Sequence, residues 1–281
     1  MHRYVVVDAF TRVPLQGNPV AVLFDCADLP PARMQRVARE LNLSETVFLL
    51  PARRGADARA RIFTPVNELP FAGHPLLGAA VALGETRPGD LLRLETAMGV
   101  VPLTLAREGG RVVGARMRQP VPTWRPFERT DELLDALGVT GSTLAALPVE
   151  IYRNGPRHVL VGLASVAALS AAVPDQRALA RFTDLAAICY AGSGTHWRSR
   201  MFSPAYGVAE DAATGSAAGP LAVHLARHGY VDHGRPIEIH QGVELGRPSR
   251  MLARTAGAGD RVDRVEVAGD AVTVAHGRLH V

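Results

Sequence analysis

The sequence predicts an α+β protein made of two similar halves, each a barrel-like β-sheet around one central apolar helix. Two observations support this fold class. The segment Arg-Ile-Phe-Thr-Pro at residues 61–65 returns as Arg-Met-Phe-Ser-Pro at residues 200–204, close to half of the 281-residue chain away. Each copy leads to a glycine, Gly73 or Gly215, that opens a run of small residues. A unit this long indicates a duplicated domain, because solenoid repeats span only about 20–50 residues.

The first half, residues 1–126, is predicted to be rich in strands. We expect strands at residues 2–8, 20–24, 46–50, 59–63, 91–95, 100–106 and 111–118, and helices at 31–42 and 73–83. Pro31 suits the first turn of a helix, and the apolar residues that follow it recur at the spacing of one buried helical face. Gly84 is expected to end the second helix.

The second half, residues 127–281, repeats this plan after three prolines between residues 120 and 126 that predict a linker. We expect helices at 131–138, 165–172, 176–181 and 215–228, and strands at 149–153, 158–163, 186–190, 198–202, 236–241, 249–255, 262–268 and 271–280. Asp175 is a predicted helix cap. The last strand, at about 270–281, is a candidate to complete the first half.

The two predicted helices at 74–83 and 216–228 are apolar on nearly every side, as expected of helices enclosed by a sheet. If their N-termini face each other across a pseudo-twofold axis, two sets of free backbone N–H groups point into one cleft. Helix N-termini bind anions. The sequence therefore predicts a site between the halves for a small anionic substrate.

Composition excludes several classes of protein. All 31 basic side chains are arginine, which rules out Schiff-base chemistry, lysine-bound pyridoxal phosphate and a P-loop lysine. The arginines are dispersed and only 5% of residues are aromatic, which argues against a nucleic-acid partner. Neither a signal peptide nor a membrane span is evident. Cys26 and Cys189 fit a reducing cytoplasm, with a single buried disulfide as the open alternative.

Glu45 is the first candidate for chemistry. It is predicted on a short connector between a helix and an apolar strand. Partial desolvation there would raise its pKa towards the range useful for general acid–base work. The alternative is a capping or solvated glutamate, as most connector carboxylates are.

The two helix starts carry the other candidates. His74, after Gly73, could orient a substrate or shuttle a proton, or it could only satisfy local backbone groups. Asp211 could bind substrate, or it could only favour the macrodipole of the helix that follows. Ser216 is most simply an N-cap. Its flanking residues do not form a nucleophile elbow, so a serine hydrolase is disfavoured.

Two weaker patterns predict neither metal nor nucleotide. His224 and His228 are four residues apart, but no H-E-x-x-H motif is present and Arg227 lies between them. The segment Gly-Ser-Gly at residues 192–194 is only a fragment of a phosphate-binding loop. We therefore expect no metal and no cofactor.

Taken together, these residues resemble the PhzF family of phenazine-biosynthesis isomerases, within the diaminopimelate-epimerase-like fold. The segments that match are residues 17–22, 41–45, 62–65, 70–75, 152–158, 196–200 and 210–216. The resemblance runs over essentially the whole chain. One departure is Ala212, where many relatives have proline after the aspartate.

The resemblance implies a cofactor-independent isomerisation of trans-2,3-dihydro-3-hydroxyanthranilate, with Glu45 carrying a proton from C3 to C1. The product would be a reactive aminoketone, 6-amino-5-oxocyclohex-2-ene-1-carboxylate. The substrate-binding residues that it implies are His74, Asp211 and Ser216, with the backbone of Gly73 and Gly215. It also implies a homodimer.

The residues at the helix starts exclude one of three alternative functions and leave two open. Diaminopimelate-type epimerases use a cysteine pair, whereas here the helix starts read Ala-Gly-His at 72–74 and Thr-Gly-Ser at 214–216, which excludes a two-thiol racemase. A related isomerase or epimerase that acts on another small amino or hydroxy acid stays open. So does a binding module that keeps the cleft without turnover.

Overall fold

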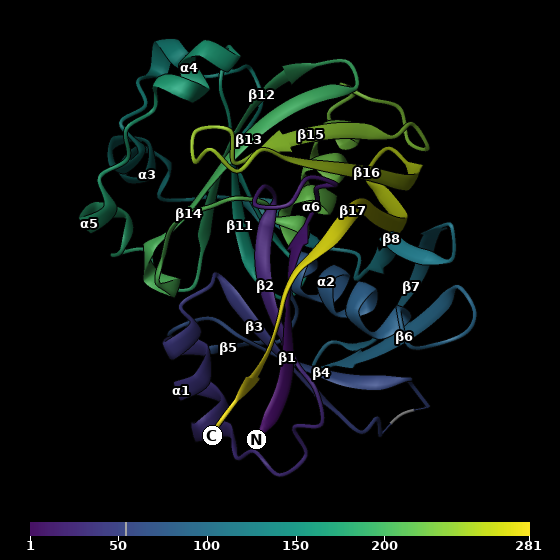
Figure 1. The fold of residues 1–281 in the computed structure, drawn as a ribbon. Coiled ribbons are helices and arrows are strands. Elements are labelled where there is room, and N and C mark those ends of the chain that lie inside the picture. The colour runs from purple at the N-terminus through teal and green to yellow at the C-terminus, as the bar shows by residue number, and fades with distance from the viewer. Residues whose placement is uncertain (54) are drawn as a thin grey trace.

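The computed structural model describes residues 1–53 and 55–281 and has the predicted α+β architecture (Figure 1). The first half contains β1 (His2–Ala9), β2 (Asn18–Leu23), α1 (Pro31–Leu41), β3 (Glu45–Leu50), β4 (Ala58–Phe63), β5 (Glu68–Leu69), α2 (Gly73–Gly84), β6 (Leu91–Thr96), β7 (Gly99–Glu108) and β8 (Arg111–Gln119). The predicted helices and long strands of this half are all present, and the two-residue strand β5 was not predicted.

Strand β9 (Thr123–Pro126) ends the first half. The second half begins with α3 (Thr130–Leu137), the 3-10 turn η1 (Gly141–Thr143), β10 (Glu150–Arg153), β11 (Arg157–Gly162), α4 (Val166–Ala171), α5 (Gln176–Leu179) and β12 (Ala186–Ser193). It continues with β13 (His196–Ser203), the 3-10 turn η2 (Pro204–Tyr206), β14 (Val208–Asp211), α6 (Gly215–Arg227), β15 (Ile237–Gln241), β16 (Ser249–Ala258) and β17 (Arg261–Leu279). Strand β14 was not predicted, because it is short and lacks an alternating pattern.

Both halves follow one scheme of strand pairing. In the first half, β2 pairs parallel with β3, and β4 pairs antiparallel with β3 and β5 and parallel with β6. In the second half, β11 pairs parallel with β12, and β13 pairs antiparallel with β12 and β14 and parallel with β15. Phe63 faces Thr46 and Phe202 faces Ala187, so Glu45 and Ala186 are equivalent positions. The repeated segment thus marks a duplicated architecture.

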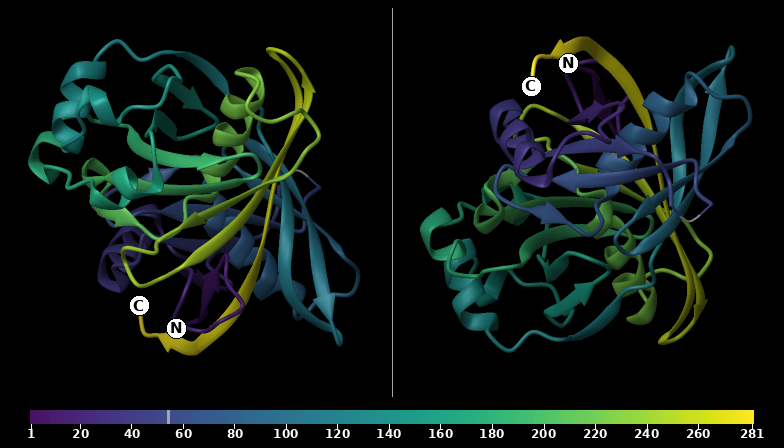
Figure 2. Two further views of the ribbon diagram at one scale, coloured as in Figure 1. Left: turned by 90° about the horizontal axis from the view of Figure 1, so that it is seen from above. Right: turned by 90° about the horizontal axis from the view of Figure 1, so that it is seen from below.

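The halves also exchange strands. The end of β17 pairs with β1, from His2 opposite Leu279 to Ala9 opposite Ala271, while β9 pairs with β10 of the second half. The yellow strand β17 crosses the whole molecule in Figure 1, and both views in Figure 2 place the two chain ends close together.

Two predictions were wrong here. The strands expected at 262–268 and 271–280 are one continuous strand, because β17 serves both halves. Part of the expected proline linker forms β9, whose one proline, Pro126, is tolerated as the last residue of the strand. The division of the chain at residues 126 and 127 stays a prediction.

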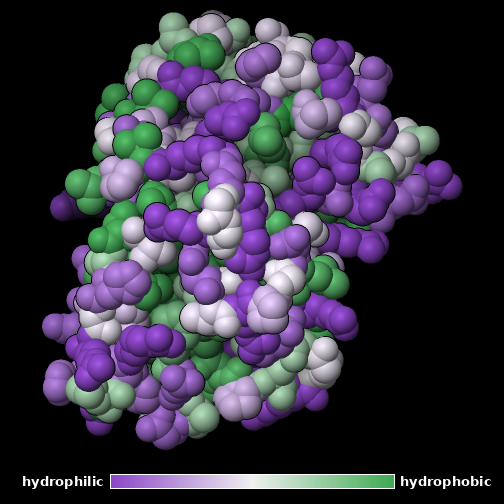
Figure 3. All heavy atoms as spheres, turned by 45° about the vertical axis from the view of Figure 1, so that its right-hand side comes forward, coloured by the Kyte–Doolittle hydropathy of each residue, from purple (hydrophilic) through white to green (hydrophobic). Residues whose placement is uncertain are grey.

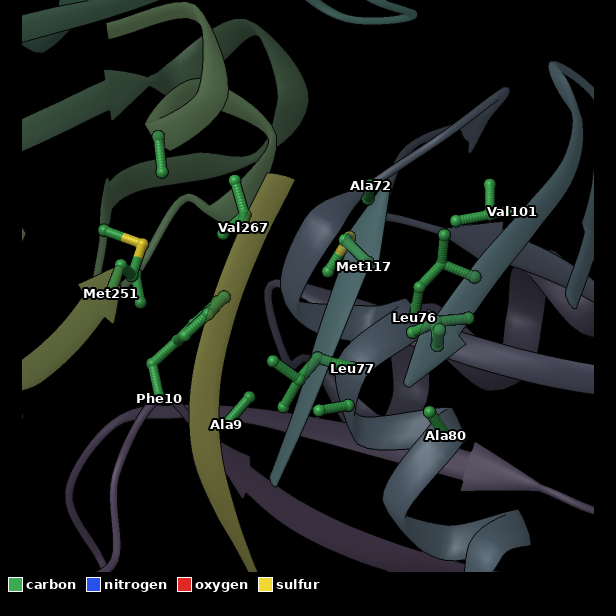
Figure 4. Packing of buried hydrophobic residues seen from close by; sticks show 14 of the residues in the cluster. Ala9, Phe10, Ala72, Leu76, Leu77, Ala80, Val101, Met117, Met251 and Val267 are labelled. Carbon is green, nitrogen blue, oxygen red and sulfur yellow. The ribbon is translucent and has the colours of Figure 1, made fainter. Parts of the chain in front are cut away.

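The two central helices are enclosed as predicted. All 12 residues of α2 are buried, and so is α6 from Gly215 to Ala226. Figure 4 shows Leu76 and Leu77 of α2 on one side of the core and Met251 and Val267 of the second half across from them. These residues belong to one continuous apolar cluster. The helix starts are therefore held by a core that both halves share.

Helix α6 contains a proline that a side chain from the β10–β11 hairpin compensates. Pro220 cannot donate a hydrogen bond to the carbonyl of Ser216, four residues earlier. The amide nitrogen Nδ2 of Asn154 donates to that carbonyl instead, at 2.8 Å. The hairpin is thereby tied to the start of α6.

Predictions about helix ends had mixed outcomes. Asp175 caps α5, as predicted, by accepting hydrogen bonds from the backbone N–H groups of Arg177 and Ala178. Gly84 is the last residue of α2 rather than a left-handed residue beyond it, whereas Gly229 after α6 has the left-handed φ of 73°.

On the face shown in Figure 3, hydrophilic side chains are interspersed with smaller hydrophobic groups, as on an ordinary protein surface. Among the described residues, no helix has the length and apolarity that a bilayer span needs.

Candidate active site

The N-termini of α2 and α6 meet at the centre of the molecule, as the sequence predicts. A Cβ atom on Gly73 would lie 2.4 Å from the carbonyl carbon of Gly215 and 2.5 Å from the backbone nitrogen of Ser216. A Cβ atom on Gly215 would lie 2.8 Å from the ring of Phe10 and 3.1 Å from the backbone nitrogen of His74. Glycine is needed at both positions because the two backbones approach so closely.

A narrow cavity lies beside these helix starts, with walls from both halves. Its volume is about 30 Å³, room for only one or two water molecules. The residues of its wall that bear on the chemistry are Glu45, Leu69, His158, Ala186, Asp211 and Ser216. These residues come from both halves, so the cavity lies between them.

Glu45 begins β3 rather than lying on a connector, and it pairs in register with Val20. Its side chain is only 13% exposed, so it is not the solvated glutamate of the alternative interpretation. Its Oε2 lies 3.1 Å from Nε2 of His74, yet neither atom completes a hydrogen bond within the described residues. Burial, and then the negative charge of Asp211, raises the pKa of Glu45 well above its usual value.

His74 is the second residue of α2, as predicted, and its side chain is 3% exposed. The Nδ2 amide of Asn18 lies 3.1 Å from Nδ1 of the ring. The same Nδ2 donates to Oδ1 of Asp211 at 2.8 Å and to the backbone carbonyl of Ala213 at 2.9 Å. Burial lowers the pKa of His74 to about 3, so the ring is neutral at physiological pH.

Asp211 ends β14 and is held by donors from both halves. Its Oδ1 accepts hydrogen bonds from Nδ2 of Asn18 at 2.8 Å and from Oγ of Ser44 at 2.9 Å. Its Oδ2 accepts one from Oγ1 of Thr214 at 2.8 Å. Burial raises the pKa of Asp211, and these three hydrogen bonds counteract part of that effect. The alternative interpretation, in which Asp211 only favours the macrodipole of α6, does not account for these hydrogen bonds.

Sequence reasoning did not single out four residues that support Asp211. Besides Asn18, Ser44 and Thr214, they include Gln241, whose Nε2 donates to the backbone carbonyl of Asp211 at 2.9 Å. Asn18 and Ser44 lie within segments that carry the family resemblance, which was a usable signal. Gln241 is far away in sequence, and nothing in its neighbours marks it.

The prediction that Ser216 is the N-cap of α6 is wrong. The cap position belongs to Thr214, the helix begins at Gly215, and Ser216 is its second residue. Thr214 occupies the cap position without a capping hydrogen bond, because its hydroxyl donates to Asp211 instead. The sequence pattern of a capping residue therefore did not identify it. Ser216 still lines the cavity, where its backbone N–H belongs to the free first turn of the helix.

His224 of α6 and His228, which follows the helix, join an ion-pair network away from the cavity. Oε2 of Glu150 lies 3.0 Å from Nδ1 of His224 and 3.2 Å from Nε2 of His228. These three ligand atoms lie within 4.8 Å of one another, close enough to hold a metal ion. The guanidinium of Arg227, however, donates to the same carboxylate oxygen at 2.9 Å and places a positive charge there. The cluster favours an ion-pair network, and the expectation of no metal stays a prediction.

The cysteines lie outside the cavity wall. Cys26 and Cys189 are both buried and free, so the alternative of a disulfide is wrong. Burial raises the pKa of each thiol to about 12, which makes both poor nucleophiles.

Known proteins similar to this chain agree with the fold. The PhzC-PhzF family, described as phenazine biosynthesis-like protein, matches residues 7–277. A trans-2,3-dihydro-3-hydroxyanthranilate isomerase from Pseudomonas aeruginosa is 66% identical over 281 residues and 100% of both chains. A predicted epimerase of known structure from the same organism is 34% identical over 100% of both chains, with a TM-score of 0.85.

A hydroxyproline epimerase from Agrobacterium vitis covers 99% of this chain and 90% of its own, with a TM-score of 0.68. At 15% identity this likeness shows the fold alone. The expected diaminopimelate-epimerase-like fold is confirmed, and the protein is an isomerase. The chain belongs to the PhzC-PhzF family of phenazine biosynthesis-like proteins.

Proposed function

We propose that this isomerase converts trans-2,3-dihydro-3-hydroxyanthranilate into 6-amino-5-oxocyclohex-2-ene-1-carboxylate, with Glu45 as both base and acid. The observation that carries the proposal is the Oε2 atom of Glu45, which is buried beside a neutral His74 and has no hydrogen-bond partner among the described residues. A relative that is 66% identical and bears the name of this activity supports the choice of substrate.

The proposed reaction moves one proton and rearranges the double bonds. The Glu45 carboxylate removes the proton from C3, and the electron pair of that C–H bond forms the C3=C4 bond. The C4=C5 pair moves to C5=C6, and the C6=C1 pair takes the proton back from the same carboxyl group at C1. The resulting enol gains a proton at C4 and loses one from its hydroxyl to become the ketone. Because atoms and electrons balance, the reaction needs no oxidant or reductant.

The environment of the cavity suits each part of this reaction. A carboxyl group with a raised pKa exchanges its proton readily near neutral pH, which a general acid–base group must do twice here. The facing starts of α2 and α6 supply free N–H groups for the substrate carboxylate. His74 and Asp211 are then left for the amine and hydroxyl. The narrow cavity would exclude water from the reactive ketone.

A direct assay tests this proposal. Purified protein is incubated with the dihydro substrate, and the absorbance of the conjugated diene is expected to fall as the double bonds rearrange. No loss beyond a control without enzyme contradicts the proposal. Deuterium incorporation from D₂O into a panel of other small amino and hydroxy acids would favour the related isomerase or epimerase. Binding without any proton exchange would favour the non-catalytic module.

The homodimer that the family resemblance implies is also a proposal. Sedimentation velocity at micromolar concentration tests it, because a monomeric species alone would contradict it.

A further inference from the structure

His158 on β11 is a buried histidine whose hydrogen-bonding capacity is unused. The residue is 1% exposed, and within the described residues neither Nδ1 nor Nε2 has a hydrogen-bond partner. Buried polar side chains in proteins are nearly always paired, because an unpaired one loses its bonds to water without replacement. Burial lowers the pKa of His158 to about 3, so the ring is neutral, with one donor and one acceptor.

The unpaired ring belongs to the wall of the cavity. Among the described residues of that wall, two side chains hold buried polar atoms without a partner, Glu45 and His158. Asp211 and Thr214, which also line the cavity, are engaged in hydrogen bonds. Since the first of the two unpaired side chains is the proposed acid–base group, the second is the strongest candidate for a further contact with the ligand.

The duplication gives His158 a defined place relative to Glu45. In the first half, Glu45 pairs in register with Val20, and in the second half the equivalent Ala186 pairs with His158. Val20 and His158 are thus equivalent positions, and Ala186 also lines the cavity. The second half therefore places a small alanine where the first half has its carboxylate, and a polar ring on the next strand.

We propose that His158 binds a polar substituent of the substrate, its hydroxyl or its amine, from the wall that the second half contributes. A hydroxyl or an amine both donates and accepts hydrogen bonds, which matches a neutral imidazole. A ligand that lacked this group would leave the ring unpaired in a dry site, so His158 would select for the fully substituted ring. This inference rests on the proposed function for the identity of the ring.

Calorimetric binding of three aromatic acids tests the inference without turnover. The probe 3-hydroxyanthranilate carries all three substituents but has no C3 hydrogen to move, anthranilate lacks the hydroxyl, and 3-hydroxybenzoate lacks the amine. For H158L we expect at least tenfold weaker binding of 3-hydroxyanthranilate. We expect less than threefold weaker binding of the analogue that lacks the contacted group. H158Q, whose amide keeps a donor and an acceptor, should recover part of the affinity.

Stability separates this role from a structural one. H158L replaces an unpaired polar ring by an apolar side chain, so its melting temperature should equal or exceed that of the wild type. The matched control is Y190F. It removes a buried hydroxyl that has no partner in the part of the chain that the structure describes and that does not line the cavity. Y190F should bind all three probes within twofold of the wild type.

Two outcomes would overturn the inference. One is binding of all three probes by H158L within threefold of the wild type. The other is a lowered melting temperature for H158L, which would show that the His158 ring stabilises the fold. Turnover of the dihydro substrate by the wild type is measured separately. Its absence would contradict the proposed function, while the binding of the probes would still decide the role of His158.

Discussion

The two halves share one pairing scheme but contribute different groups to the cavity. Glu45 of the first half corresponds to Ala186 of the second. Asp211 of the second half faces Met201, as Leu69 of the first half faces Ile62, so these two positions correspond as well. Each half thus supplies one carboxylate where the other half has an apolar residue. The duplication builds the cavity, and the divergence leaves it with one carboxylate from each half.

The two copies of the repeated segment show a second contrast. In each copy the arginine lies over the phenylalanine two residues later, at 5.1 and 5.0 Å from the ring centroid. Arg61 pairs with Glu68 near the surface, with exposures of 15% and 40%. Arg200 pairs with Glu210 at exposures of 8% and 13%, and it also donates to the backbone carbonyl of Ala172. Both copies are largely buried, and the difference lies in the ion pair, which is nearer the surface in the first half than in the second.

Loss of Glu45, the proposed base, should have the largest effect, because the equivalent residue of the second half is Ala186. Glu45→Gln keeps the shape of the side chain but cannot take a proton, so kcat should fall by about 10²–10⁴-fold while ligand binding is retained. Steady-state kinetics and calorimetry measure the two quantities. Glu68→Gln, at an exposed carboxylate, is the control and should be fully active. An active Glu45→Gln enzyme would mean that the base is wrongly assigned.

The same substitution has a consequence for stability. The raised pKa of Glu45 means that the folded protein binds more protons than the unfolded chain between the ordinary pKa of 4.5 and the raised value. The free energy of unfolding therefore falls as the pH rises through that window, and the loss persists above it. At neutral pH, Glu45→Gln should melt at a higher temperature than the wild type. Equal melting temperatures from pH 4 to pH 8 would contradict the raised pKa.

The contrast between the two arginines predicts the next largest effect. Arg200→Ala leaves Glu210 buried and unpaired and should lower the free energy of unfolding by about 3–5 kcal/mol. Arg61→Ala removes a pair nearer the surface and should cost only about 0–1 kcal/mol for the lost ion pair. Urea denaturation measures both. Equal losses would show that the burial of the second copy does not matter.

The helix starts predict a smaller contrast. An added methyl group at Gly73 meets backbone atoms, which cannot move aside, whereas at Gly215 its nearest neighbour is the ring of Phe10. Gly73→Ala should therefore lower stability by about 1–3 kcal/mol, and Gly215→Ala by less. Gly141→Ala is the control, because nothing lies within 4 Å of the added atom. Thermal melting would contradict this order if Gly215→Ala were the less stable protein.

The smallest effect concerns coupling between the halves. The negative charge of Asp211 contributes to the raised pKa of Glu45, so Asp211→Asn should lower that pKa. The acid limb of the pH profile of kcat/KM should then move to lower pH, even though the variant is slower overall. A limb that stays in place would show that the two carboxyl groups do not interact.

The sequence by itself determined the main architecture. The repeated Arg-x-Phe segment, the two all-apolar helices and the glycines at their starts predicted a duplicated α+β fold with a site between the halves. These signals are local, because helix enclosure and close backbone approach leave their mark on adjacent residues. Local position made Glu45, His74, Asp211 and Ser216 candidates, and the family resemblance supplied the roles expected of them.

Only the tertiary structure decided how distant residues meet. The exchange of β9 and β17 between the halves, the support of Asp211 by Gln241 and the unpaired ring of His158 all depend on strands far apart in the chain. Local patterns carry no record of such contacts, since burial and hydrogen bonding are set by the partner that folding brings near. The sequence thus determined which groups were available, and the packing of the two halves decided which of them face the cavity.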